Sequence, residues 1–423
     1  MSGKTHGGFR NRLTLILCVV LHAFTHAYAT MLVPLYLLMG ADLHLAGVKR
    51  ASLLVSLYAL VYNIGSYATG ILSDRFNRKL LLGAGLALNA LAITLIGLTH
   101  RYDLLLLWAV MAGVGGAIFH PAAGALVPAL FPKAPGMAIG LLGIGSGLGF
   151  FFGPQFAGWR AQSAHWSSFW LQIAQWQKPC VELGVAGLVT SLIFLLVAGD
   201  AEVRPWARIS VSAPLDRAMK IRSLTIGLVL GCRDFAAVAG FSLAGIYLLR
   251  ARHMDAQQAG TVLGATMLLS VLTNPTIVWL THNSRRLPAL RIALILSGLV
   301  AAAIPWLTAD WAIPILLAFQ TCQLATFALS DAALLERFPA AARGRAYGLY
   351  LSIAGSMSAA GPWVMGAWTD ALGDRANFRS GYILPFAAIG AAMFLATLAI
   401  PLVRKLDPVI PADPLIAPAA AAG

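Results

Sequence analysis

The two halves of the chain repeat one pattern of glycines and prolines at an offset of about 207 residues. The first copy consists of Phe131-Pro132, Gly136, Gly140, Gly147, Gly153-Pro154 and Gly158. The second copy consists of Phe338-Pro339, Gly344, Gly348, Gly355, Gly361-Pro362 and Gly366. The markers hold one offset to within a residue, which chance does not readily produce even in a chain with 41 Gly and 21 Pro. The repeat predicts a duplicated fold with two related halves.

Each half contains continuous apolar runs of about 20 residues, the length of a helix that crosses a bilayer. With 59% hydrophobic and 11% charged residues, the chain is far more apolar than soluble proteins, in which roughly a quarter of residues are charged. A membrane barrel would alternate apolar and polar residues, so the runs favour helices. We therefore predict an all-α polytopic membrane protein with twelve transmembrane helices in two pseudo-symmetric six-helix halves. The helices are centred near Leu21, Ala59, Leu91, Gly115, Gly147, Leu188, Ala237, Leu269, Gly298, Phe319, Ala354 and Ala392.

The basic residues are distributed unequally between the predicted loops. If both termini are cytoplasmic, the termini and the inward loops hold about 20 of the 30 Lys and Arg residues, which is the positive-inside bias. Topology thereby explains the net charge of +14, and no nucleic-acid partner is predicted. The expected location is a bacterial-type inner (plasma) membrane. Residues 1–198 are predicted to form the N-terminal half, 199–222 a cytoplasmic linker, 223–406 the C-terminal half and 407–423 a disordered tail.

Two segments leave alternatives open. Arg10 and Arg12 precede an apolar run that ends in Ala27-Tyr28-Ala29, as in a secretory signal, but apolar residues continue to Met39 and favour a first transmembrane helix. Between the fifth and sixth predicted helices, residues 159–179 contain four tryptophans. Tryptophan prefers the headgroup boundary, which favours an interfacial segment over a lid that gates or captures substrate.

The turn after the second predicted helix carries a charged motif. It includes Gly70, Asp74, Arg75, Arg78 and Lys79. This segment resembles the G-x-x-x-D-R-x-G-R-[RK] signature of the major facilitator superfamily, except that Asn77 replaces a glycine. The resemblance implies the twelve-helix fold of that superfamily and transport by alternating access. The charges are interpreted as a gate that locks and releases neighbouring helix ends, and the alternative is that they only set topology.

The fifth predicted helix resembles the antiporter signature of the same superfamily. It carries glycines at spacings of four and five residues, together with Gly153-Pro154, and Gly361-Pro362 repeats that pair in the eleventh helix. Small residues four apart allow close helix packing, and proline bends a helix. Because the pair is repeated, ordinary packing is the alternative to a gating role in antiport.

A third motif resembles the fosmidomycin-resistance-protein branch of the superfamily. The fourth predicted helix contains Gly113-Val-Gly115-Gly116-Ala-Ile-Phe119-His120-Pro121, similar to the G-x-G-x-A-x-F-H-P stretch of that branch. His22, His26 and Tyr28 in the first helix and Arg233 in the seventh also fit. The branch usually has an acidic residue at the position of His26, so the chemistry at this coupling position is changed.

The ionisable residues deep within the predicted helices fall only on helices 1, 4, 7 and 10, which line the central cavity in the fold that the resemblance implies. Burying a charge in the membrane costs about 2.5 to 3.5 kcal/mol, so a purely structural role does not explain why these residues are present. We predict a substrate site of His22, His26, Tyr28, His120, Arg233, Gln320 and Gln323, and proton coupling through Asp234, Asp331 and His26.

Each of these residues also has a structural interpretation. The histidines can be neutral interior residues, the glutamines can join helices, and Asp331 can belong to the helix end formed by Glu336-Arg337. Asp234 lies about 100° around the helix from Arg233, so it is predicted to pair elsewhere. No third ligand lies near His22 and His26 in the sequence, and the four cysteines form no C-x-x-C pair, so no metal, cofactor or disulfide is predicted.

These features together predict a monomeric secondary transporter in the lipid bilayer that exchanges protons for a small-molecule substrate. Export of a drug-like or anionic compound is favoured, and the alternative is a proton-coupled symporter that imports an organic anion or a metal chelate. A membrane enzyme is disfavoured because no nucleophile motif, nucleotide loop or metal set accompanies the histidines. A scaffold or receptor without transport is the remaining class.

Overall fold

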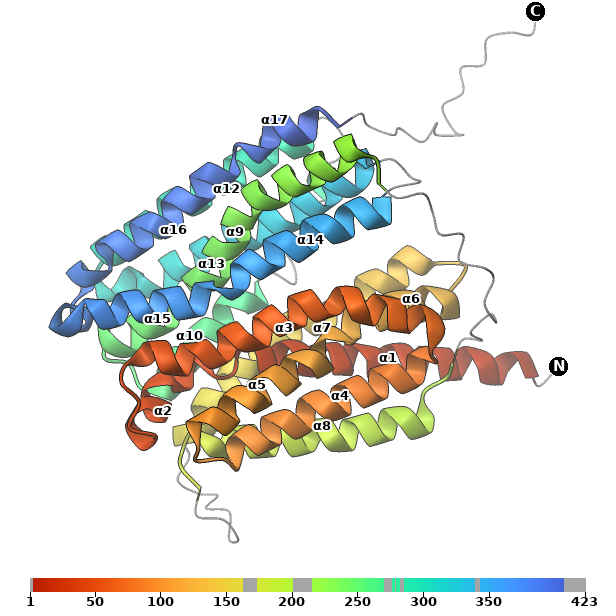
Figure 1. Ribbon diagram of the computed structural model, residues 1–423, viewed down its shortest axis with the longest axis horizontal. Coiled ribbons are helices and arrows are strands. Elements are labelled where there is room, and N and C mark those ends of the chain that lie inside the picture. The colour runs from red at the N-terminus through yellow and green to blue at the C-terminus, as the bar shows by residue number, and fades with distance from the viewer. Residues whose placement is uncertain are drawn as a thin grey trace, which may run out of the picture.

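The computed structural model describes residues 3–162, 173–200, 215–269, 276–277, 279–281, 285–338 and 343–406, and these residues form helices joined by short turns (Figure 1). The N-terminal half contains α1 (Gly3–Thr30), η1 (Val33–Leu35), α2 (Tyr36–Asp42), α3 (Val48–Arg75), α4 (Arg78–Gly97), α5 (Tyr102–Ala117), α6 (Phe119–Leu130), α7 (Pro135–Gln162) and α8 (Gln177–Val197). The C-terminal half contains α9 (Arg217–Arg250), α10 (Ala256–Leu268), α12 (Arg286–Ala303), η3 (Ile304–Trp306), α13 (Ala309–Arg337), α14 (Arg343–Ala359), α15 (Gly361–Ala371), η4 (Gly373–Asn377), η5 (Arg379–Tyr382), α16 (Ile383–Ala396) and α17 (Ala399–Arg404).

The predicted helical membrane fold is confirmed. Ten helical stretches among the described residues are long and apolar enough to cross a membrane. The two other predicted spans, near Leu269 and Ala354, correspond to α10 and to the α14–α15 pair. Both are shorter as single helices, because part of the chain after α10 lies outside the described residues and because the eleventh span is interrupted at Ala360.

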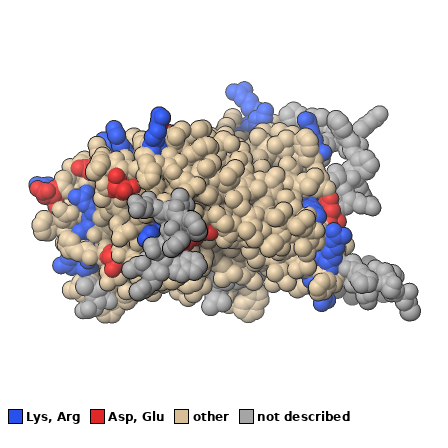
Figure 2. Space-filling view, turned by 90° about the horizontal axis from the view of Figure 1, so that it is seen from below, with Lys and Arg blue, Asp and Glu red and all other residues tan. Residues whose placement is uncertain are grey.

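The helices run side by side in two stacked bundles, with α1–α8 below and α9–α17 above in Figure 1. The first turn of α1 and the last turn of α17 lie at one end of the molecule, here named the terminal end, and the opposite end is named the distal end. In Figure 2, Lys, Arg, Asp and Glu lie over the left half and at the right end, and the band right of centre is largely free of charges except at its upper edge. This band is the surface expected to face lipid.

The two halves contact each other through two symmetry-related helix pairs. The α7 helix packs against α10, and α3 packs against α14 and α15. Gly158 of α7 faces Ala256 without room for a side chain, and its repeat partner Gly366 faces Lys49 and Ser52 of α3 in the same way. This pair of repeated glycines, Gly158 and Gly366, therefore lies where helices of opposite halves approach closely.

The distal end is closed by a contact between the halves. Asp370 at the end of α15 accepts hydrogen bonds from the backbone N–H groups of Val48 (2.8 Å) and Lys49 (2.9 Å), the first two residues of α3. Gly47 precedes them with a φ of 94° and has no side chain that could cap the helix. A carboxylate of the C-terminal half therefore supplies the N-cap of a helix in the N-terminal half.

Toward the terminal end, several repeated glycines have no neighbour among the described residues. The Asn63 amide near the middle of α3 donates to the Gly355 carbonyl in the second half of α14 (3.1 Å). Closer to the terminal end, Gly136, Gly140 and Gly143 of α7 face open space, and so does Gly348 of α14. Glycines of the same repeat are thus packed in the distal part and unpacked in the terminal part.

The structure describes the start of the seventh span and both Gly-Pro pairs, whereas three predicted segments lie wholly or partly outside the described residues. The α9 helix begins at Arg217, before the predicted boundary at 222, because the Asp216 side chain accepts a hydrogen bond from Met219 N (2.6 Å) and caps it. Pro154 lies inside the continuous helix α7, whereas Pro362 stands in the first turn of a new helix, α15. Residues 163–172 of the tryptophan-rich insertion, 201–214 of the linker and the tail 407–423 lie outside the described residues.

Candidate functional site

A break in the fourth predicted helix positions His120. The α5 helix ends at Ala117 and α6 begins at Phe119, with Pro121 in its first turn. Pro121 has no N–H to donate to the Ala117 carbonyl, and the Thr69 hydroxyl of α3 donates to that oxygen instead (2.8 Å). A polar side chain from a neighbouring helix thereby stabilises irregular backbone at membrane depth, where interrupted helices commonly form binding sites.

His120 completes a cluster with the two histidines of α1. The Nε2 atoms of His22 and His26 lie 3.0 Å apart, and the ring centroid of His120 lies 5.1 Å from that of His22 and 5.6 Å from that of His26. One ring nitrogen from each residue lies within 4.8 Å of the others. We name His22, His26 and His120 the histidine cluster. The structure therefore brings together three of the predicted substrate-site residues.

The hydrogen bonds of the cluster determine its tautomers. His22 Nδ1 lies 2.8 Å from the Leu142 carbonyl oxygen of α7, which only accepts, so Nδ1 carries a proton. In the neutral ring His22 Nε2 is then an acceptor, and His26 Nε2–H donates to it. His26 therefore donates to His22, and His22 donates to the Leu142 carbonyl. In this arrangement Nδ1 of His26 carries a lone pair and no proton.

The glycines of α7 hold the two histidines of α1 in place. A side chain at Gly145 would lie 2.7 Å from His22 Cβ, and one at Gly149 would lie 2.9 Å from His26 Cβ. This four-residue spacing is the one that the antiporter-like motif predicts for close helix packing. The described part of that motif therefore contacts the candidate site directly.

The histidine cluster is buried on one side and open on the other. His22 is 5% exposed and stacks on Phe119 (centroids 4.6 Å apart), whereas His120 is exposed. The α6 helix contacts both α3 and α7, which pack against helices of the C-terminal half. His120 is the exposed member of the cluster on this helix. The Tyr62 ring packs edge-on against His120 (6.0 Å), and its buried hydroxyl has no partner among the described residues.

A second cluster in the C-terminal half surrounds Arg233. This side chain is fully buried, and all five of its N–H groups donate within the protein. Nε and Nη2 donate to Asp234 Oδ1, Nη1 donates to the Thr326 carbonyl (3.2 Å) and to the Ser330 hydroxyl, and Nη2 also donates to the Tyr350 hydroxyl (2.9 Å). A substrate anion would have to displace one of these partners to reach Arg233.

The prediction that Asp234 pairs away from Arg233 is wrong. The Nε atom of Arg233 lies 2.6 Å from Asp234 Oδ1. The two Cβ atoms diverge around the helix, but the long arginine side chain turns back to the adjacent carboxylate. Buried charges require such a partner, which explains the local pairing.

Asp331 lies beside this ion pair and not at a simple helix cap. The Tyr350 hydroxyl accepts from Arg233 and lies 3.5 Å from Asp331 Oδ1, to which it donates. Asp331 is half-buried, in contrast to Asp234, which is 6% exposed. With all three groups ionised, Arg233, Asp234 and Asp331 carry a net charge of −1. We name them, with Tyr350, the charge cluster.

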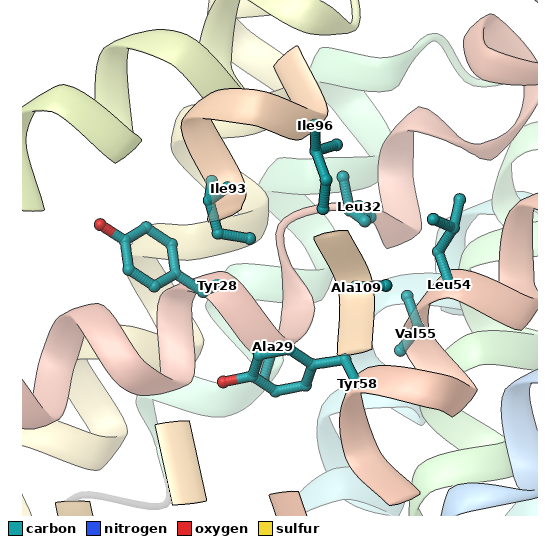
Figure 3. Close-up of a pocket in the computed structure, with 9 residues that line it drawn as sticks. All are labelled: Tyr28, Ala29, Leu32, Leu54, Val55, Tyr58, Ile93, Ile96 and Ala109. Atoms are coloured by element: carbon teal, nitrogen blue, oxygen red, sulfur yellow. The ribbon is translucent and has the colours of Figure 1, made fainter. Parts of the chain in front are cut away.

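Three other predicted site residues are placed differently. The Tyr28 hydroxyl donates to the Leu183 carbonyl of α8 (3.0 Å), and Tyr28 borders a small apolar cavity with Tyr58 (Figure 3). It therefore joins helices and does not share the face of His22 and His26. Gln320 and Gln323 of α13 are buried, and their Oε1 atoms have no partner among the described residues. Their place in a substrate site stays a prediction.

The charged motif after α3 forms local contacts. Arg78 donates to the Ser73 carbonyl and to the Ala125 carbonyl of α6 (both 3.4 Å), which links the terminal ends of α3 and α6. Asn77 has a φ of −59° and caps α4 by accepting from Leu80 N (2.9 Å), so the glycine of the signature is not needed here. Gly70 lies within α3, and Arg75 is exposed at its end.

The structure describes only some of the remaining residues of the predicted gate. Lys79 begins the first turn of α4, and the side chain of Asp74 lies outside the described residues. Gly153 faces Ala27 of α1, and Gly361 faces Ala239 of α9 without room for a Cβ. Each glycine therefore packs within its own half, between the fifth and first helices or between the eleventh and seventh. Their role in gating stays a prediction.

Sequence reasoning missed the residues that complete the two clusters. Thr69 of α3 supports the helix break beside His120, and Ser330, Thr326 and Tyr350 satisfy Arg233. One signal was present, because Ser330 and Tyr350 are polar residues within apolar runs, where such side chains find partners on other helices.

Comparison with known proteins agrees with this architecture. The chain is 26% identical over 269 residues to the uncharacterized MFS-type transporter YceJ of Bacillus subtilis, covering 62% of this chain and 64% of that protein. It is 26% identical over 163 residues to the quinolone resistance protein NorA of Staphylococcus aureus, covering 38% of this chain and 39% of NorA. The chain thus spans less than two thirds of the length of either relative.

Solved structures show the same fold. A bacterial homolog of the human lysosomal transporter Spinster, in an inward-facing and unoccupied conformation, matches with a TM-score of 0.75 at 16% identity, over 95% of this chain and 99% of that one. The resemblance to the fosmidomycin-resistance branch stays a prediction. The family model of the Major Facilitator Superfamily matches residues 15–231 and 227–420, and the chain therefore belongs to this superfamily of membrane transporters.

Proposed function

We propose that this transporter exports a small drug-like or anionic compound in exchange for protons, by alternating access between the two halves. The observation that carries the proposal is the charge cluster. Two carboxylates and one guanidinium share a buried site in the membrane, so that one proton neutralises the cluster. Because an uncompensated charge at this depth is costly, proton binding and conformational change are expected to be coupled.

The geometry assigns different roles to the two carboxylates. Asp234 is held by two N–H groups of Arg233 and is the permanent counter-ion. Asp331 is hydrogen-bonded by the hydroxyls of Tyr350 and Tyr347 and is more exposed than Asp234, which supports it as the proton carrier. Tyr350 hydrogen-bonds both Arg233 and Asp331, so protonation of Asp331 changes a partner of the ion pair.

The two ends of the molecule support this order of transport steps. Asp370 joins the halves at the distal end, and described glycines near the terminal end have no neighbours among the described residues. The positive-inside bias favours a cytoplasmic terminal end, so we infer that this conformation receives a cytoplasmic substrate. Drug resistance in the name of the relative NorA also supports export.

Import of an organic anion or a metal chelate is the second candidate. The observation that favours it is the histidine cluster, since neutral imidazoles with defined lone pairs are ligands and not anion traps. Direction of transport separates the two candidates.

Uptake of a fluorescent quinolone and of labelled fosmidomycin tests the proposal in cells with and without the protein. Export predicts lower accumulation that an uncoupler of the proton gradient restores, and import predicts higher accumulation. Equal accumulation of both probes, in cells shown to hold the folded protein in the membrane, would contradict export of these compounds.

The role of Asp331 is tested in proteoliposomes. Asp331→Asn imitates the protonated carboxyl, so exchange of labelled for unlabelled substrate is expected to persist while transport driven by a pH gradient is lost. The matched control is Asp374→Asn, which removes an exposed carboxylate of η4 at the distal end. Gradient-driven transport at the parent rate in Asp331→Asn would contradict the assignment.

A further inference from the structure

We propose that the histidine cluster is a binding site for a divalent transition-metal ion such as Zn²⁺, Ni²⁺ or Co²⁺. The inference deepens the proposed transport function by assigning a ligand class to the open site. It is tested by binding to the purified protein, without any flux. Its failure would therefore leave the transport proposal standing.

The ligand atoms have the spacing that a metal requires. Zinc binds imidazole nitrogen at about 2.0 to 2.1 Å, so two nitrogens that share the ion lie roughly 3.0 to 3.4 Å apart. The Nε2 atoms of His22 and His26 lie 3.0 Å apart, as a one-turn separation on a helix allows. The nitrogen of His120 lies within 4.8 Å of both and has to approach by up to roughly 1.4 to 1.8 Å. His120 is exposed, which leaves its ring free to rotate toward the ion.

The outer contacts of His22 are those of a metal ligand. A ligating histidine almost always donates its other ring N–H to a carbonyl, a carboxylate or water, which orients the ring. His22 donates Nδ1–H to the Leu142 carbonyl and therefore presents Nε2 without a proton. His26 needs only to transfer its proton from Nε2 to Nδ1 to present its own lone pair. Metal binding then requires no net proton release from these two residues.

The type of metal follows from the donors. Three imidazoles without a thiolate suit Zn, Ni, Co or Cu, whereas Mg²⁺ and Ca²⁺ prefer oxygen ligands. No carboxylate is among the three ligands, so the ion keeps its positive charge and has open coordination positions. The exposed side of His120 leaves room for water or an anionic chelating substrate to complete the coordination.

The arrangement also explains two features that packing alone leaves without a purpose. Three histidines converge in a described part of the N-terminal half where the neighbours are Phe119, Phe150 and Tyr62. The buried Tyr62 hydroxyl, which has no partner among the described residues, lies beside His120 and can bond to a water on the ion.

The experiment measures Zn²⁺ and Co²⁺ binding to the full-length protein in detergent, purified with a tag that contains no histidine. Zn²⁺ affinity is obtained by competition with a chromophoric chelator, and Co²⁺ is followed by its visible absorption, which reports ligand number and geometry. The expected result is one ion per chain in the micromolar range or tighter. His22→Gln and His120→Gln should each weaken binding by about 100-fold.

The matched control is His100→Gln, since His100 is exposed in the turn between α4 and α5 and lies outside the cluster. Thermal unfolding without metal verifies that each variant is folded, and His120→Gln is the decisive variant because its side chain is exposed. No binding at about 100 μM ion, or equal binding by the parent and His120→Gln, would overturn the site. Equal loss in His100→Gln would assign the binding to surface histidines and overturn it as well.

Discussion

The cap that Asp370 provides to α3 predicts a shift in the conformational equilibrium when it is removed. In Asp370→Ala, the N–H groups of Val48 and Lys49 lose the carboxylate that joins the halves at the distal end. The same N–H groups are solvated by water when the distal end opens. The mutation therefore destabilises the closed distal end and leaves the open one unchanged.

The magnitude follows from the two bonds. Loss of an N-cap costs about 0.5 to 2 kcal/mol, and a carboxylate at a helix N-terminus contributes about 0.3 to 1 kcal/mol. These contributions overlap, and Asp370 is half-exposed, so we expect about 1 to 2 kcal/mol in total. At 1.4 kcal/mol per factor of ten, the ratio of distal-open to distal-closed molecules should rise about 5- to 30-fold.

Spin-label distance measurements detect this shift. Labels at His100→Cys and Ser380→Cys report the separation of the halves at the distal end, because both residues are exposed there. The background replaces Cys232 and Cys322, which are partly exposed, and retains the two buried cysteines.

The control is Asp374→Ala, which removes an exposed carboxylate from the same region. Asp370→Ala should increase the population at the longer distance, and Asp374→Ala should not. An unchanged distribution in Asp370→Ala, or the same change in both variants, would refute the cross-half cap as the closing contact.

Three further predictions concern single side chains. Thr69→Val leaves the Ala117 carbonyl without its donor at the helix break and should lower the free energy of unfolding by about 1 to 3 kcal/mol. Thermal or denaturant unfolding measures this loss, and Thr69→Ser should retain most of the parent stability. Arg233→Ala leaves the buried Asp234 and the half-buried Asp331 without a cation and should abolish transport, whereas Arg233→Lys should retain part of it. Full activity of the alanine variant in the accumulation assay would contradict a role in coupling. Tyr28→Phe loses only the hydrogen bond to the Leu183 carbonyl, so we expect parent-like transport and a loss of about 1 kcal/mol in the free energy of unfolding. A specific rise in the KM for the substrate would show instead that Tyr28 contacts the substrate.

The candidate site could be predicted from the sequence only in outline. Ionisable residues in apolar runs identify His22, His26, His120 and Arg233, because the cost of burying them is a local property of the sequence. Which of them meet is not local. His22 and His120 are joined by the break at Pro121 and by the packing of α6 between α3 and α7, and no short-range pattern encodes that packing.

The membrane character of the chain, its helices and its duplication were determined by the sequence itself, because apolar run length and repeated Gly-Pro pairs act locally. The tertiary structure alone decided the partners across long separations, such as Asp370 with Val48 and Asn63 with Gly355. It also decided that Arg233 turns back to its neighbour Asp234, since a flexible side chain selects its partner from everything that surrounds it after packing. Covalent order and hydropathy specify which segments enter the bilayer, whereas side-chain contacts depend on how the segments then pack against each other.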